Sequence, residues 1–156
     1  MPTDRLTKEE YGILLALAAS ERSEDPHTKV GAVIVNRFNE ILATGYNGLK
    51  SGQSLNPSLS RDDKRKHMIH AEQNALRFVK NGDNPHTIYT SLSPCLSCAQ
   101  AIMANNIKRV IYAKEYGRDT SFKEIFDIYG VEYYQVHPSM CKNITKSLQN
   151  LLSYLH

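Results

Sequence analysis

The stretch HAEQNALRFVKNGDNPHTIYTSLSPCLSC, from His70 to Cys98, predicts a helix, a strand and the start of a second helix in succession. The first helix runs from about 69 to 79. The run 87–91 is short and rich in β-branched and aromatic residues, as expected of a strand. Pro94 fits the first position of the second helix. An α/β fold is therefore expected, with polar side chains at the starts of both helices.

The rest of the chain continues this alternation. Further helices are expected at about 8–22, 94–105, 120–129 and 139–155, and further strands at 31–35, 40–46, 109–113 and 131–136. Strand–helix–strand units pair their strands in parallel, with right-handed crossovers. About 17 residues separate the last two strands, which is too long for a hairpin and right for a helical crossover. We therefore expect a three-layer α/β/α sandwich: one mixed sheet of five strands, the last two parallel, with helices on both faces.

The composition is that of an ordinary globular protein. With 156 residues, 41% hydrophobic and 22% charged, one domain spanning 1–156 is expected. The net charge of +3 is compatible with an anionic small molecule and does not suggest a nucleic-acid groove. No apolar run approaches the ~20 residues of a membrane span, and the N-terminus lacks a signal-peptide apolar region. A cytoplasmic protein that does not bind a membrane is expected, in which Cys141 is a reduced thiol.

One segment breaks the alternation of helices and strands. Residues 47–66 contain Gly48, Gly52, Pro57 and four serines, and they are predicted to form a loop insert of about 20 residues. Such a loop is functional or mobile, and a disordered surface insertion is the alternative. Its basic run, 61–66, carries charges of both signs. A solvated loop face is therefore favoured there over a lid or subunit-interface element that contacts phosphates.

Three side chains near the ends of the opening stretch form the donor set of a zinc ion. The imidazole of His70 and the thiolates of Cys95 and Cys98 leave a fourth position for water, as in catalytic rather than structural zinc sites. The two cysteines are three residues apart, so they share one face of a first helical turn, where the helix dipole favours thiolates. Water bound to such a zinc reaches a pKa of about 7. Glu72 is not needed as a ligand and is free to move protons.

This arrangement suits hydrolytic removal of an amine from an amidine-like carbon, with Glu72 carrying protons to the ring nitrogen and to the leaving ammonia. Alone, His-x-Glu is typical of surface helix turns, and Cys-x-x-Cys of a redox pair or of half a structural zinc site. Together, with Pro94 before the first cysteine, they match the signature of zinc deaminases. A catalytic zinc site is therefore predicted.

At these residues the chain resembles the zinc-dependent cytidine deaminase superfamily, and most closely its deoxycytidylate (dCMP) deaminase branch. The resemblance covers about residues 5–136. It rests on DPHTKVGAVIV (25–35), GYNG (45–48), HAEQNA (70–75), SPCLSC (93–98) and IKRVIY (107–112), with Tyr116 and Arg118. The zinc motifs specify the superfamily, and GYNG with the long insert points to the dCMP branch. The expected parallel pairing of the last two strands also resembles the dCMP, tRNA-adenosine and polynucleotide cytosine deaminases. It does not resemble the free-cytidine enzymes.

The resemblance implies roles for the site residues. His70, Cys95 and Cys98 match the zinc ligands, and Glu72 matches the proton shuttle. Asn47 matches the residue that contacts the sugar.

Further substrate contacts are implied in the same way. The Ala71 backbone amide would bond the pyrimidine carbonyl oxygen, and the Ser93 carbonyl would accept from the leaving amine. Candidates for the substrate phosphate are Lys29, Arg118 and Lys50. Tyr116 would stack on or flank the base, with a place in the core as the alternative.

The expected function is deamination of dCMP to dUMP, which supplies dUMP for thymidylate synthesis. The resemblance implies a hexameric homo-oligomer controlled by dCTP with Mg²⁺ and by dTTP. One zinc ion per chain is expected, since no cysteine precedes Cys95 to build the second, structural site of some members. Two alternatives stay open: a polynucleotide deaminase of the tRNA-adenosine type, and a non-catalytic protein whose assembly zinc stabilises.

Overall fold

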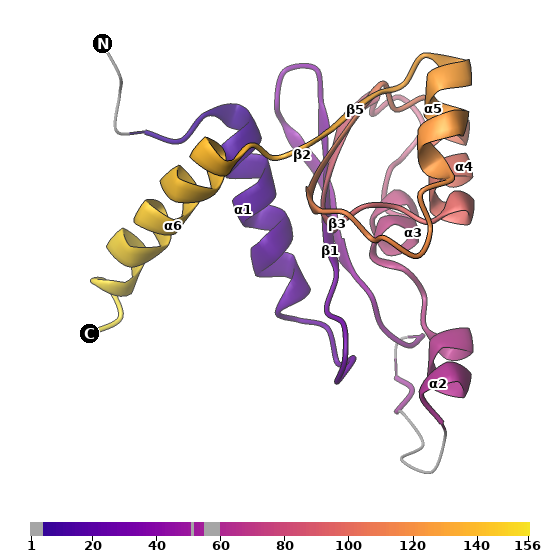
Figure 1. Ribbon diagram of the computed structural model, residues 1–156, viewed down its shortest axis with the longest axis horizontal. Helices are drawn as coiled ribbons and strands as arrows, with labels where there is room; N and C mark the ends of the chain where they lie inside the picture. The colour runs from indigo at the N-terminus through magenta and orange to yellow at the C-terminus, as the bar shows by residue number, and fades with distance from the viewer. Residues whose placement is uncertain (1–4, 51, 55–59) are drawn as a thin grey trace.

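The computed structural model describes residues 5–50, 52–54 and 60–156, which form one five-stranded sheet with helices around it (Figure 1). The strands are β1 (Gly31–Asn36), β2 (Ile41–Tyr46), β3 (Pro85–Leu92), β4 (Arg109–Lys114) and β5 (Glu132–Gln135). The helices are α1 (Lys8–Ser20), α2 (Arg61–His67), α3 (Ala71–Leu76), α4 (Leu96–Ala104), α5 (Phe122–Tyr129) and α6 (Pro138–Leu152). Apart from α2, the elements follow the expected order.

The sheet is mixed and has the strand order β2-β1-β3-β4-β5. Strand β1 is antiparallel to both of its neighbours, whereas β3, β4 and β5 are parallel to one another. The parallel pairing of β4 with β5 confirms the prediction from the long connection between them, which contains α5. Strand β1 is buried from Gly31 to Val35, as expected where both faces of a sheet are covered.

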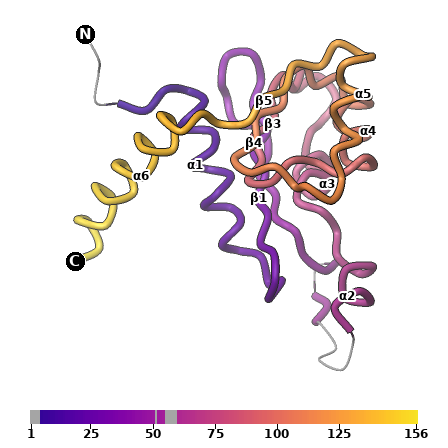
Figure 2. Tube along the Cα trace, in the orientation of Figure 1, coloured from indigo at the N-terminus to yellow at the C-terminus, as the bar shows by residue number. Residues whose placement is uncertain are grey.

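Helices cover both faces, which confirms the three-layer α/β/α sandwich. Alternate side chains of β1 point to opposite faces: Val33 belongs to the core under α1 and α6, and Ile34 to the core under α3, α4 and α5. The two groups of helices lie on opposite sides of the strands (Figure 2). Among the described residues, no helix combines the length and the apolar composition that crossing a membrane requires.

Two glycines allow helices to lie close against β1 and β2. A Cβ atom at Gly31 would lie 1.9 Å from the carbonyl oxygen of Ala16 in α1. At Gly45, a Cβ atom would lie 2.5 Å from both the carbonyl oxygen of Ala71 and the backbone nitrogen of Ala75. A side chain at Gly45 would therefore displace α3.

The prediction of a loop throughout 47–66 is wrong at its C-terminal end, where α2 forms. Ser60 caps this helix, because its Oγ accepts a hydrogen bond from the backbone nitrogen of Asp63 at 3.1 Å. Acidic residues occupy the first turn and basic residues the last, which complements the helix dipole. The helix has no apolar periodicity, so hydrophobic patterning could not reveal it. Residues 51 and 55–59 of the predicted loop lie outside the described residues.

Two helix boundaries near the candidate site also differ from expectation. Helix α3 covers Ala71–Leu76 rather than 69–79, because the chain beyond it continues as turns bonded to the third residue back. Helix α4 begins at Leu96, not at Pro94, because Cys95 has extended backbone angles (φ −73°, ψ 172°) and is the N-cap. Each of these helices therefore begins just after a candidate zinc ligand.

Candidate metal centre and its pocket

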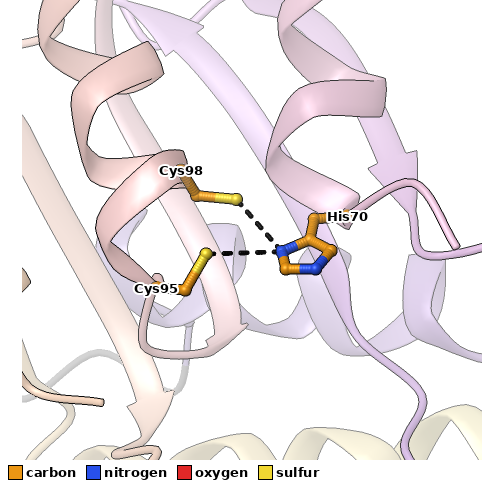
Figure 3. A group of neighbouring side chains, drawn as sticks. All are labelled: His70, Cys95 and Cys98. Carbon is orange, nitrogen blue, oxygen red and sulfur yellow. Dashed lines mark hydrogen bonds between the residues drawn. The ribbon is translucent and has the colours of Figure 1, made fainter. Parts of the chain in front are cut away.

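Three side chains from the starts of α3 and α4 lie close together (Figure 3). His70 is the N-cap of α3, Cys95 is the N-cap of α4, and Cys98 lies in the first turn of α4. The Nδ1 atom of His70 lies 3.5 Å from the Sγ of Cys95 and 3.3 Å from the Sγ of Cys98. The structure thus brings together the three residues that the sequence predicts as zinc ligands.

The spacing of these three atoms fits a zinc ion. Zinc–sulfur distances of about 2.3 Å and zinc–nitrogen distances of about 2.0 Å, at tetrahedral angles, separate nitrogen from sulfur by roughly 3.5 Å. The ligand atoms lie within 4.8 Å of one another, and no fourth His, Cys, Asp or Glu of the described residues joins the group. Three protein ligands of this chemistry leave one position of a tetrahedral zinc for water.

The two thiols shift each other's pKa. A hydrogen bond from Cys98 is the main cause that lowers the pKa of Cys95 to about 3, with further contributions from His70 and Ser97. The same contact, together with burial, raises the pKa of Cys98. Binding of a metal by both sulfurs as thiolates therefore releases a proton from this pair of cysteines.

Glu72 lies beside this group and is almost fully buried. It is in the first turn of α3, and only 3% of its surface is exposed. Burial raises the pKa of Glu72, although contacts with Cys98 and His70 offset part of this effect. A carboxyl group with a raised pKa can both hold and release protons near neutral pH. Its contacts with Cys98 and His70 place Glu72 next to the candidate metal ligands, so it is a candidate proton carrier.

A pocket of about 350 Å³ adjoins His70, Cys95 and Glu72. Its wall is formed by the loop after α1, the residue after β2, helix α2, the start of α3 and the loops after β3 and β4. The volume lies within the range of pockets that bind small molecules. The candidate metal site therefore opens into space for a small-molecule ligand.

Asn47 holds one wall of this pocket in place. Its Oδ1 accepts from the backbone nitrogen of Val30, and its Nδ2 donates to the carbonyl oxygen of Thr28, each at 2.8 Å. Its own carbonyl oxygen accepts from the hydroxyl of Ser23 at 2.8 Å. The structure thus assigns Asn47 a role in positioning the loop after α1, which the sequence reasoning missed. Its contact with a sugar stays a prediction.

Three other predicted substrate contacts also line the pocket, namely Ala71, Ser93 and Tyr116. As the first residue of α3, Ala71 has a backbone N–H with no acceptor inside the helix. The Oγ of Ser93 accepts from the backbone nitrogen of Tyr116 at 2.7 Å, which joins the loops after β3 and β4. Tyr116 is half-buried in this wall.

The predicted phosphate contacts lie elsewhere. Lys29, Lys50 and Arg118 are absent from the residues that line the pocket within the described part of the chain. The ammonium group of Lys29 pairs with Glu21 at 3.7 Å, and Arg118 is exposed. Their contact with a phosphate stays a prediction without support from the pocket.

Three cations that were not among the predicted phosphate contacts do line the pocket, namely Arg61, Lys64 and Arg65 of α2. For their run, 61–66, a solvated loop face was favoured over a lid or subunit-interface element that contacts phosphates. The signal that could have identified them is the sequence Ser60-Arg-Asp-Asp63, which is an N-cap pattern. A helix that starts there places the three cations on one face.

Comparisons with known proteins show the family. Residues 6–114 match the family model of the cytidine and deoxycytidylate deaminase zinc-binding region. A deoxycytidylate deaminase from Pongo abelii is 34% identical over 151 residues, which cover 89% of this chain and 85% of the relative. The crystal structure of dCMP deaminase from the cyanophage S-TIM5 in apo form has a TM-score of 0.67 and 30% identity, covering 82% of this chain and 96% of that one. The same cyanophage enzyme in complex with dCMP and dUMP gives a TM-score of 0.64 and 29% identity, covering 82% and 93%. The chain therefore belongs to the cytidine and deoxycytidylate deaminase family.

Proposed function

We propose that this chain deaminates dCMP hydrolytically to dUMP and ammonia, with one zinc ion held by His70, Cys95 and Cys98. One observation carries the proposal: a buried glutamate, Glu72, and three zinc-type donor atoms meet at one pocket of small-molecule size. The relatives named deoxycytidylate deaminases support the choice of dCMP, as does the similar cyanophage enzyme that was crystallised with dCMP and dUMP.

The proton transfers fall to Glu72. When bound, zinc lowers the pKa of a water molecule in its open position to about 7. Glu72 takes one proton from the attacking water and delivers it to the ring nitrogen. It then takes the second proton from the hydroxyl group that has added to the carbon and delivers it to the leaving amine, so both protons come from the water. Because burial raises its pKa, Glu72 holds the proton between these transfers instead of losing it to solvent.

The pocket wall orients the base and the sugar. The backbone N–H of Ala71 bonds the pyrimidine carbonyl oxygen, and the carbonyl of Ser93 accepts from the leaving amine. Asn47 lies beside the sugar, and Tyr116 flanks the base. All four residues line the pocket. Lys29 and Arg118 do not line it, so their contact with the substrate phosphate has no support from the pocket.

The proposal extends to assembly and control, which rest on the family resemblance alone. One domain, 1–156, would form a cytoplasmic hexamer that dCTP with Mg²⁺ activates and dTTP inhibits. Light scattering tests the hexamer, and dCMP saturation curves with and without each effector test the control. A monomer in solution, or curves that no effector changes, would contradict this part.

The direct test is ammonia release by protein loaded with one equivalent of zinc, using dCMP, deoxycytidine, single-stranded DNA and RNA as substrates. Release should be far faster from dCMP than from the other three. Equal rates with deoxycytidine would refute phosphate recognition, and a preference for RNA would favour the polynucleotide deaminase. Zinc binding without turnover of any substrate would favour the non-catalytic assembly protein.

A further inference from the structure

We propose that α2 is the phosphate-binding element of the pocket: Arg61, Lys64 and Arg65 hold the substrate phosphate and set the preference for nucleoside monophosphates over nucleosides. The inference rests on the proposed deamination of dCMP. It assigns binding residues to the substrate phosphate, for which the predicted contacts Lys29, Lys50 and Arg118 do not line the pocket.

The three cations share one face of α2. Side chains at positions i, i+3 and i+4 of a helix lie on the same side, and Arg61, Lys64 and Arg65 have this spacing. All three line the pocket that also holds His70 and Glu72. One pocket thus joins the candidate catalytic group to a cationic helix face.

The acidic residues of α2 are kept away from this face. Asp62 and Asp63 are not among the lining residues. The carboxylate of Asp63 accepts from the Ser60 hydroxyl at 2.9 Å and pairs with Lys66 at 3.6 Å. The mixed charge of the run 61–66 is therefore segregated in space: three of its four cations line the pocket, whereas Lys66 and the two acids do not.

Among the described residues, the pocket cations have no side-chain partner. Within the described part of the chain, the side chains of Arg61, Lys64 and Arg65 make no ion pair or hydrogen bond. Like charges one turn apart destabilise a helix, and α2 buries no residue that would offset their repulsion. An anion bound in the pocket would remove the repulsion and supply the missing contacts.

Helix α2 is tied to the candidate metal site at its C-terminal end. Only Met68 and Ile69 separate it from His70. The nitrogen of Ile69 donates to the carbonyl oxygen of Gly48 at 2.7 Å, and the nitrogen of Gly48 donates back at 3.0 Å. At no more than about 3.6 Å per residue, the Cα atoms of Arg65 and His70 lie at most about 18 Å apart. The cations and the candidate metal ligands His70 and Cys95 also line one pocket of about 350 Å³, which is the volume of a small-molecule site.

A phosphate monoester fits the chemistry of this face. With a second pKa near 6, it is largely a dianion at neutral pH. Arginine donates to it through a planar fork, and lysine adds a point charge. The lining also contains the Asp25 carboxylate, but its Oδ1 already accepts from the backbone nitrogens of His27 and Thr28. A nucleoside without phosphate has no charge that α2 would attract.

Single alanine substitutions test the assignment. The kcat/KM values for dCMP and for deoxycytidine are measured with zinc-loaded Arg61→Ala, Lys64→Ala, Arg65→Ala and the control Lys66→Ala, which lies on the same helix but not in the pocket. Alanine is the best helix former, so α2 should persist in every variant. Either arginine substitution should lower the dCMP-to-deoxycytidine ratio of kcat/KM by about 10- to 100-fold, mainly through KM. Lys66→Ala should leave the ratio within about twofold of wild type, as for an exposed charge.

Binding of the product supplies a readout without turnover. Calorimetry with dUMP and deoxyuridine should show that the arginine variants lose affinity for dUMP only. If wild type does not deaminate dCMP, the proposed function fails, and dUMP binding still decides the role of α2. If wild type prefers dCMP but the pocket variants behave like Lys66→Ala in both assays, the phosphate is held elsewhere and the inference is wrong.

Discussion

Helices α2 and α3 are separated by only three residues, 68–70, yet different forces hold them in place. Helix α2 buries none of its residues and depends on the Ser60 cap and on favourably placed charges. Helix α3 buries four of its six residues and packs against β1 and β2, with Gly45 at the point of closest approach. One helix is therefore set by surface electrostatics and the other by core packing.

This difference matches the two tasks that we propose for the pocket. Proton transfer requires positions held to within fractions of an ångström, which packing can enforce on Glu72. Attraction of a phosphate requires charge, which acts over several ångströms and tolerates motion. Substitutions in or against α3 should therefore change the chemistry or the stability, and changes at α2 should affect affinity.

The largest effect is expected within α3, from Glu72→Gln. The amide keeps the shape of the side chain but cannot take up and release the proton, so kcat for dCMP should fall by about 10²- to 10⁴-fold. Zinc content should stay at one ion per chain, because Glu72 is not a proposed ligand. Ammonia release and a zinc assay measure the two quantities.

The same change at Glu124, an exposed residue of α5, is the control and should alter neither quantity. A Glu72→Gln protein with the kcat of wild type would show that another group moves the protons.

The next effect tests the packing of α3, through Gly45→Ala. The added Cβ would overlap the Ala71 carbonyl oxygen and the Ala75 nitrogen, so the free energy of unfolding should fall by about 1–3 kcal/mol. Urea unfolding of zinc-loaded protein measures this. Gly117→Ala is the matched control, since a Cβ there meets nothing within 4 Å. Equal unfolding midpoints for the two variants would mean that α3 can shift without cost.

A smaller effect is expected from salt, which should weaken the attraction between the α2 cations and the phosphate of dCMP. Raising the ionic strength from about 0.01 M to about 1 M shortens the Debye length from roughly 30 Å to 3 Å. The KM for dCMP should then rise severalfold, because the α2 cations are screened, whereas kcat should stay constant. The KM for deoxycytidine, which carries no phosphate, serves as the control. A parallel rise for both substrates would remove the electrostatic explanation.

The smallest effect compares two helix caps. Thr7 caps α1 through a reciprocal pair of hydrogen bonds with Glu10, and Thr7→Ala should lower the free energy of unfolding by about 1 kcal/mol, because α1 packs on the core. Ser60→Ala removes the cap hydrogen bond of α2. It should lower the free energy of unfolding by less than about 0.5 kcal/mol, since α2 can open without exposing a core. Urea unfolding measures both, and amide exchange should show the loss of protection within α2. Equal losses of unfolding free energy in the two variants would show that α2 contributes to the stability of the fold as much as α1 does.

The sequence was a good guide where the cause is local. The spacing of Cys95 and Cys98 on one helical turn and the length of the connection between β4 and β5 each predicted what the structure has. Helix α2 was missed because every residue in it is polar, so its signal lies in the Ser60 cap and not in hydrophobic periodicity. The bonds of Asn47 were missed because its partners, Thr28 and Val30, lie on a different segment.

By itself, the sequence predicted the donor set of the metal site, the residue that we propose as the proton carrier, and the layered α/β fold. These follow from side-chain chemistry, from short spacings and from patterns of apolar residues, which do not depend on how distant segments meet. Only the tertiary structure decided which cations face the pocket. The path of the insert in space depends on the pairing of Gly48 with Ile69 and on a helix with no buried face. For that reason α2 lies at the pocket, whereas Lys29 and Arg118, which the family resemblance favoured, do not.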